Sequence, residues 1–151
     1  MRIIQAKSYA ELSYEAAKLI AAQITLKEDS VLGLATGSTP IGYLQFYEVA
    51  DWEEKEELLL LPYAHPYGID LFLGEPGLLG QGIGTRCLDM VCSYLFSQKQ
   101  ADAICIDPRV DNKRAIRCYE KAGFSYVKTK QQGEKVLGKW VACRIMHRLP
   151  E

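Results

Sequence analysis

The chain has 151 residues, of which 48% are hydrophobic and 25% charged, and this is the size and composition of a single domain with its own core. Its formal net charge of -1 and its pI of about 6.2 exclude an overall positive field that would gather nucleic acid or anionic lipid. No segment approaches the roughly twenty apolar residues of a membrane span.

The cysteines and histidines predict neither a metal site nor a disulfide framework. Five cysteines and two histidines form no C-x-x-C pair and no metal-ligand spacing. An odd number of thiols at apolar-patterned positions favours a reducing compartment, and residues 1–12 lack the apolar run of a signal peptide. We therefore expect a cytoplasmic protein without metal.

The first part of the chain predicts a strand at residues 2–5 and then a helix. Ser8 and Glu11 have the spacing of a capping box, and apolar residues recur at helical intervals after them. Residues 31–35 and 41–49 are expected to form two strands joined by a turn. The run DWEEKEE at 51–57 is typical of an exposed charged loop.

The second part alternates strands and helices. Residues 67–73 predict a strand, a glycine-dense turn follows, and residues 82–99 show the clearest helical period. A buried strand at 103–106 precedes a helix that is capped by Asp111 or Asn112 and stopped by Gly123. Strands at 124–130 and 139–148, with a polar turn at 131–135, predict a hairpin. The order indicates an α/β layer architecture.

The glycine-dense turn LGQGIGT lies between an expected strand and the clearest helix. Its amides would gather at a helix N-terminus, where the dipole favours an anion such as a diphosphate. A glycine triplet alone is equally typical of a dinucleotide fingerprint or of a plain tight turn. A nicotinamide site is disfavoured because no compact βαβ unit surrounds the turn.

Together with AIRCYEKAGF at 115–124, this loop resembles the GCN5-related N-acetyltransferase (GNAT) family, and within it the aminoglycoside 6'-N-acetyltransferases. PIGYLQFYEV, DWEE and GIDLFLGEP precede the loop in the family's order, so the resemblance covers about residues 40–151. One departure stands at Leu79, where the general family pattern has Arg or Gln. A side-chain contact to the diphosphate is therefore missing, which leaves the backbone as the main anchor.

The resemblance implies a mixed, mostly antiparallel sheet with flanking helices and a central pair of splayed parallel strands. It also implies a direct transfer from acetyl-CoA, used as a co-substrate, to a neutral amine, with amides on the splayed strand polarising the carbonyl. The residues that it implies for CoA binding are Leu71, Phe72, Leu73, Leu79, Gly80, Gln81, Gly82, Ile83, Gly84, Thr85, Asn112 and Tyr119.

Two residues are implied as catalytic. Tyr119 would protonate the departing thiolate, although by pattern alone it is as well explained as a packed helix tyrosine. Asp70 would lie near the amine, because alternation along a strand places it on the face of Phe72 and opposite Ile69 and Leu71. Without the resemblance, the favoured interpretation of Asp70 is an ordinary strand-end carboxylate facing water.

Four residues complete the expected acceptor site. Trp52, Glu53 and Glu54 combine an aromatic plate with carboxylates that suit a polycationic amine, although a charge run is usually a solvated loop. Asp107 is a lower-ranked substrate contact, because Asp-Pro is also a common turn.

The first forty residues resemble a different family, the glucosamine-6-phosphate deaminases, whose ATGSTP loop holds a sugar phosphate. Here the same residues also make an ordinary turn between strands. We therefore expect one domain with a deaminase-like segment at 1–40, a GNAT core at 41–151, and one helix where the GNAT fold has two.

The leading interpretation is an N-acetyltransferase for a small cationic amine, such as an aminoglycoside, which would confer antibiotic resistance. The alternatives are an acetyltransferase for a siderophore-type hydroxylated lysine and a non-catalytic CoA or sugar-phosphate binding module. Neither a nucleic acid nor a membrane is an expected partner, and a homodimer is compatible with the resemblance.

Overall fold

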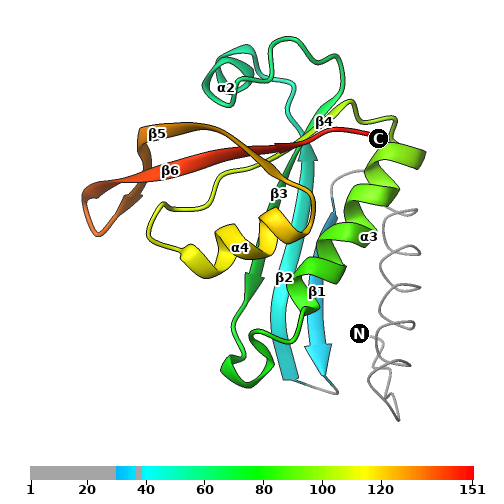
Figure 1. The fold of residues 1–151 in the computed structure, drawn as a ribbon, viewed down its shortest axis with the longest axis vertical. Coiled ribbons are helices and arrows are strands. Elements are labelled where there is room, and N and C mark those ends of the chain that lie inside the picture. The colour runs from blue at the N-terminus through cyan, green and yellow to red at the C-terminus, as the bar shows by residue number, and fades with distance from the viewer. Residues whose placement is uncertain (1–29, 37–38) are drawn as a thin grey trace.

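The computed structural model describes residues 30–36 and 39–151, with side chains from Ile41 onward (Figure 1). The strand expected at 2–5 and the helix expected after Ser8 lie outside these residues, as does the question of one helix or two. The described strands form a six-stranded sheet in the order β1-β2-β3-β4-β6-β5. They are β1 Ser30–Thr36, β2 Thr39–Glu48, β3 Pro66–Leu73, β4 Ala103–Ile106, β5 Ser125–Val136 and β6 Lys139–Arg148.

β3 and β4 form the parallel pair of this otherwise antiparallel sheet, which confirms the expected mixed sheet with helices beside it. Their register consists of Pro66 with Ala103, Tyr67 with Ile104 and Gly68 with Cys105. β3 then continues to Leu73, still paired with β2, while β4 ends at Ile106. The two parallel strands therefore diverge, as the sequence predicts.

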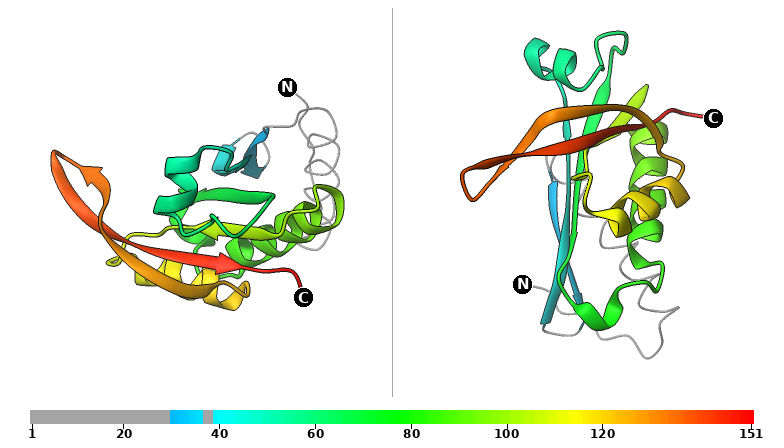
Figure 2. Two further views of the ribbon diagram at one scale, coloured as in Figure 1. Left: turned by 90° about the horizontal axis from the view of Figure 1, so that it is seen from above. Right: turned by 60° about the vertical axis from the view of Figure 1, so that its left-hand side comes forward.

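Two helices cover one face of the sheet, α3 Ile83–Gln98 and α4 Lys113–Lys121 (Figure 2). The main core lies between them and the sheet. It contains fully buried side chains of the strands and of α3, among them Leu44, Phe46, Leu88, Val91, Leu95 and Ile104. None of the described helices is long and apolar enough to cross a membrane.

A second, smaller core lies on the opposite face of the sheet. Leu58 and Leu60, from the segment after β2, pack with Ala103, Cys105 and Ile145. The buried His147 ring holds this segment down, because its Nε2 lies 2.8 Å from the Leu58 carbonyl oxygen. This second core therefore anchors residues 58–60, which lie between β2 and β3 in the chain, against the sheet.

The charged run at 51–57 is not the exposed loop that the sequence analysis expects but a short helix, α2 Trp52–Glu57. Asp51 caps it, since its Oδ1 accepts a hydrogen bond from the Glu54 N–H at 2.9 Å. Glu53 and Glu54 lie in the first turn, where the helix dipole favours negative charge. The three-residue spacing of Asp51 and Glu54 is the capping signal that the charge run obscures.

The C-terminal hairpin is confirmed, but its turn lies further along than expected. β5 continues through the polar residues 131–135 to Val136, and the chain turns at Leu137 and Gly138 with φ of 48° and 81°. Positive φ at both central residues suits the twist of a two-residue hairpin. The register slips between Lys130 and Glu134, so the polar stretch forms a bulge in the strand and not its end.

The bulge depends on Gly133. A Cβ at this position would lie 2.4 Å from the Cβ of Cys143, which a side chain cannot relieve without moving the strands. Gly133→Ala should therefore lower the free energy of unfolding by about 1–3 kcal/mol, measured by urea denaturation. Gly77→Ala is the control, because its Cβ would meet only Glu75 Oε1 at 3.5 Å. Equal stability of the two variants would contradict this packing.

Candidate active site

Beyond its pairing with β4, β3 has backbone N–H groups that point away from β2. The Gly74 N–H donates to the Ile41 carbonyl of β2 at 2.8 Å. Because successive N–H groups of a strand point to opposite edges, Phe72 also faces β2, whereas Leu71 and Leu73 face the other edge. β4 has already separated there, since its last partner on β3 is Gly68. Two of the three expected oxyanion donors thus face the divergence.

The glycine loop follows this edge and opens onto the surface. After the short 3-10 helix η1 Pro76–Leu78, Leu79 is extended, and Gly80 and Gly82 have φ of 81° and 77°. A Cβ added at either glycine would meet no heavy atom within 4 Å, so open space lies beside both. The loop therefore has room for a ligand along its backbone.

Gly82 is also the N-cap of α3 and has no side chain with which to satisfy the first turn. The Arg86 N–H reaches the Gly82 carbonyl at 3.1 Å, which leaves the earlier amides of Ile83, Gly84 and Thr85 without the usual helical acceptors. Such amides at a helix N-terminus, with its positive dipole end, bind anions such as a diphosphate.

Gly84 draws the start of α3 close to its neighbours. A Cβ there would lie 3.0 Å from Cys118 Sγ of α4 and 3.5 Å from Leu71 Cδ2 of β3. Thr85 adds a contact between its Oγ1 and Cys118 Sγ at 3.4 Å. The loop itself is held by the Gln81 amide, which donates to the Gly77 carbonyl at 2.8 Å. The glycine loop, the β3 edge and α4 therefore meet at one place.

Tyr119 of α4 is buried, with 7% of its surface exposed. Burial raises the pKa of its phenol well above 10, and electrostatic repulsion from neighbouring groups, among them Asp70 and Asp107, adds to the increase. The phenol is therefore protonated at neutral pH. Both aspartates therefore lie within electrostatic reach of Tyr119, although they come from β3 and from the end of β4.

Asp70 occupies the face that alternation predicts. Ile69 is 2% exposed in the main core, Asp70 is half-buried, and Phe72 is 54% exposed. Burial raises the pKa of the Asp70 carboxyl. Asp70 therefore lies on the sheet face opposite α3 and is partly withdrawn from water.

Asp107 follows β4 and lies close to Asp70. The pKa of Asp107 is raised to about 6, first by burial and then by the charge of Asp70, while Lys130 lowers it. The residue as a whole is exposed. Water therefore weakens both the desolvation and the Asp70 repulsion that raise its pKa, and the direction of the increase is what matters for its chemistry.

Of the three residues expected from the acidic run, Trp52, Glu53 and Glu54, only Glu54 is close enough to the other carboxylates to share their electrostatic effect. Glu54 is half-buried and contributes to the raised pKa of Tyr47, as do Asp70 and Asp107. Trp52 and Glu53 are exposed on the first turn of α2, and Trp52 keeps 68% of its surface. Glu54 is more buried than Trp52 and Glu53 because the three residues lie on a helix, and an exposed loop would not predict this difference.

Several residues on this face were missed by the sequence analysis. Tyr47 lies over Gly68, where a Cβ would come within 2.8 Å of its hydroxyl oxygen. Tyr43 stacks on Phe72 with ring centroids 5.9 Å apart. Both tyrosines alternate along β2 with the buried Leu44 and Phe46, and this period of two is the signal that could have located them.

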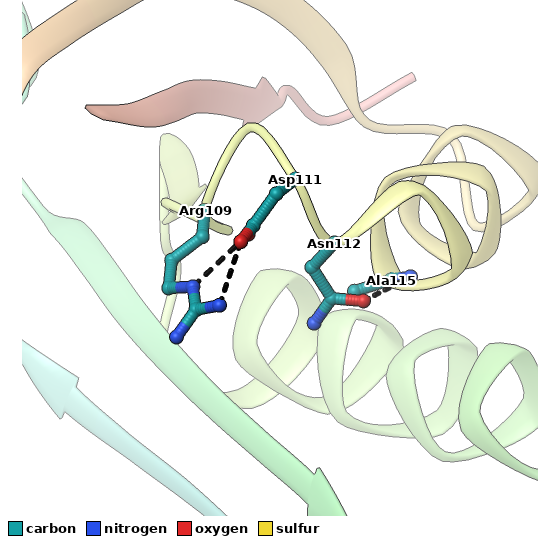
Figure 3. Close-up of polar contacts among 4 residues, drawn as sticks. All are labelled: Arg109, Asp111, Asn112 and Ala115. Carbon is teal, nitrogen blue, oxygen red and sulfur yellow. Dashed lines mark hydrogen bonds and ion pairs between the residues drawn. The ribbon is translucent and has the colours of Figure 1, made fainter. Parts of the chain in front are cut away.

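Asn112 caps α4, as the sequence predicts (Figure 3). Its side-chain oxygen accepts a hydrogen bond from the Ala115 N–H at 3.2 Å. Beside it, the Arg109 guanidinium makes two hydrogen bonds to Asp111, at 3.0 and 2.7 Å. The expected contact between Asn112 and CoA remains a prediction.

The model of the acetyltransferase (GNAT) domain family matches residues 6–131. The chain belongs to this family. Aminoglycoside N(6')-acetyltransferase type 1 of Klebsiella pneumoniae is 40% identical over 90 residues, which are 56% of this chain and 42% of that protein. A solved structure of aminoglycoside acetyltransferase AAC(6')-Ib with coenzyme A and kanamycin is 25% identical. It covers 98% of this chain and 92% of that one, with a TM-score of 0.58.

The deaminase resemblance is also confirmed. Glucosamine-6-phosphate deaminase of Lachnoclostridium phytofermentans is 50% identical over 58 residues, which are 38% of this chain and 24% of that protein. The GNAT chain thus spans less than half the length of these two curated relatives. The family model begins at residue 6, so it includes most of the segment that resembles the deaminases.

The two aspartates of the segment after β4 should affect stability with opposite sign. The pKa of Asp107 is raised from 3.8 to about 6, so its ionisation costs stability above pH 6 and costs nothing below about pH 4. Asp107→Asn should therefore stabilise the protein at pH 7.5, and this gain should vanish at pH 4.

Asp111 is the matched control. Its hydrogen bonds to Arg109 lower its pKa, so its ionised form contributes stability that is lost only in acid. Asp111→Asn should destabilise the protein at pH 7.5, again by urea denaturation. A loss of stability in Asp107→Asn at pH 7.5 would contradict the placement of Asp107 among like charges.

Proposed function

We propose that this GNAT domain transfers an acetyl group from acetyl-CoA to a primary amine of a small polycationic acceptor of the aminoglycoside class. One observation carries the proposal. The divergence of β3 from β4 brings the glycine loop, two outward-facing amides, a buried tyrosine and a pair of carboxylates to one place. The solved relative with coenzyme A and kanamycin, and the kanamycin resistance protein of Rhizobium radiobacter, 46% identical over 57 residues, support the same class.

The residues present fit the diphosphate of acetyl-CoA. Open space at the Cβ positions of Gly80 and Gly82 allows a ligand to approach the backbone closely. The first-turn amides of α3 can donate to phosphate oxygens in place of the missing side chain at Leu79. The Arg86 guanidinium, which donates to the Gln81 carbonyl at 3.3 Å, adds positive charge beside the loop.

Acetyl-CoA supplies an activated acyl group as a thioester, and the chain's own residues orient and protonate the reactants. The N–H groups of Leu71 and Leu73 are placed to donate to the carbonyl oxygen as negative charge develops there. Asp70 and Asp107 hold the ammonium group of the acceptor, and the raised pKa of Asp107 makes it suited to take up a proton near neutral pH. Tyr119 donates its phenolic proton to the departing sulfur.

The charges of the site link acceptor binding to the acidity of Tyr119. Asp70 and Asp107 both raise the pKa of the phenol, because they repel the phenolate. An ammonium group bound between them offsets that repulsion and lowers the pKa of Tyr119 again. The tyrosine therefore becomes a better proton donor when an amine is bound.

The acceptor face suits an amino sugar with several positive charges. The carboxylates of Glu54, Asp70 and Asp107 each raise the pKa of Tyr47, so their negative charges act in the same part of the face. The exposed Tyr43 and Phe72 rings provide an apolar stacked surface on the same face of the sheet. An aminoglycoside has amines that can pair with these carboxylates and sugar rings that can pack on these aromatic rings.

The function is tested by thiol release from acetyl-CoA with kanamycin, spermidine and glucosamine 6-phosphate as acceptors. We expect turnover with kanamycin and binding of CoA whether or not an acceptor is present. Binding of CoA without turnover of any amine would contradict the enzymatic function. Release of ammonia from glucosamine 6-phosphate would instead indicate that the deaminase-like segment is active.

Tyr119→Phe separates proton donation from packing. The change keeps the buried ring and removes the hydroxyl, so the affinity for CoA measured by calorimetry should not change. Loss of a positioned general acid should lower kcat about a hundredfold. A variant with the kcat of the native protein would show that Tyr119 serves only to pack α4.

A further inference from the structure

The bulge in β5 brings charged side chains to the rim of the acceptor face. Lys130 pairs with Cys143 and Glu134 pairs with Val141, so three residues of β5 stand opposite one of β6. Bulges of this kind redirect the side chains beside them. Cys143, the partner of Lys130, in turn forms a bridge with Arg109, two residues after Asp107. Lys130 is therefore within electrostatic reach of the Asp107 carboxylate, whose pKa it lowers.

Lys130 connects the bulge to α2. Its Nζ lies 2.5 Å from Glu57 Oε2, a contact between residues 73 positions apart in sequence. The lysine side chain is 28% exposed and therefore mostly covered. Lys130 also lowers the pKa of Asp107, as a cation within electrostatic reach does. One ammonium group of the protein is thus paired with Glu57 and acts on the charge of Asp107.

Carboxylates act on this part of the face, and a mostly covered lysine such as Lys130 needs such partners. Asp70 and Glu134 raise the pKa of Asp107, and Glu57 holds Lys130 directly. A face that gathers carboxylates attracts cationic ligands. An ammonium group of the chain in the same field reduces that attraction by one charge and competes with an ammonium group of a ligand.

We propose that Lys130, held by Glu57, is a specificity-determining residue of the acceptor site that weakens the binding of cationic acceptors in proportion to their charge. The inference rests on the proposed function, because it concerns the same acceptor. Lys130 touches the rim of the site and takes no part in the transfer itself. An acceptor with several amines is repelled by the internal cation at each ammonium group and gains most from its removal, whereas an acceptor with one amine gains little.

The test compares Lys130→Gln with Glu57→Gln in thiol-release assays with kanamycin. Lys130→Gln removes the internal cation, so KM for kanamycin should fall about three- to tenfold. Glu57→Gln removes a carboxylate and frees Lys130 to pair with Asp107, so KM should rise. If the ion pair merely fastened α2 to β5, both variants would loosen the site and shift KM in the same direction.

Two controls complete the design. Glucosamine, with one amine, should change its apparent affinity less than twofold in Lys130→Gln, measured as a substrate or as a competitor of kanamycin. Lys135→Gln changes the net charge equally at a lysine that lies 5.9 Å over the Trp140 ring, and should leave KM unchanged.

The outcomes separate the two proposals. If the native protein turns over kanamycin and Lys130→Gln has an unchanged or higher KM, the role of Lys130 is wrong and the proposed function stands. A fall in KM that Lys135→Gln reproduces also overturns the role of Lys130. If the native protein acetylates no amine, both proposals fail.

Discussion

β3 and β4 share three registered residue pairs and then separate, and the arrangement of the active site depends on that separation. Backbone amides inside a sheet are normally consumed by the neighbouring strand, because a buried N–H without a partner costs stability. β4 ends at Ile106, so the amides of Leu71 and Leu73 can be satisfied by a ligand. Gly84 then allows α3 to begin within contact of the same strand, which brings the anion-binding end of the helix to this edge.

The same divergence allows groups from the two sides of the sheet to act on each other. Tyr119 packs among the helices, whereas Asp70 lies on the opposite face, and yet the charge of Asp70 contributes to the pKa of the phenol. A continuous sheet would separate them by its hydrogen-bonded backbone. At the diverging edge of β3, Tyr119 on one side of the sheet thus lies within electrostatic reach of the carboxylates on the other.

Local signals in the sequence predicted the parts of the site that local chemistry builds. The glycine loop, the helix that follows it and the Asn112 cap were found because each has a short signature. α2 was missed because a run of charges outweighed the Asp51 cap, and the hairpin turn was misplaced because polar residues in a bulge resemble a loop. The pairing of Lys130 with Glu57 joins residues 73 positions apart, and no local pattern records such a contact.

Amide hydrogen exchange of β3 tests the central claim most directly, since it reports on single N–H groups along the strand. The N–H groups of Leu71 and Leu73 should exchange faster than those of Asp70 and Phe72, which face β2. Saturating acetyl-CoA should slow Leu71 and Leu73 and leave the other two unchanged. Equal protection of all four amides in the free protein, or no slowing at Leu71 and Leu73 with acetyl-CoA, would contradict the account of the diverging strands as the acyl-binding edge.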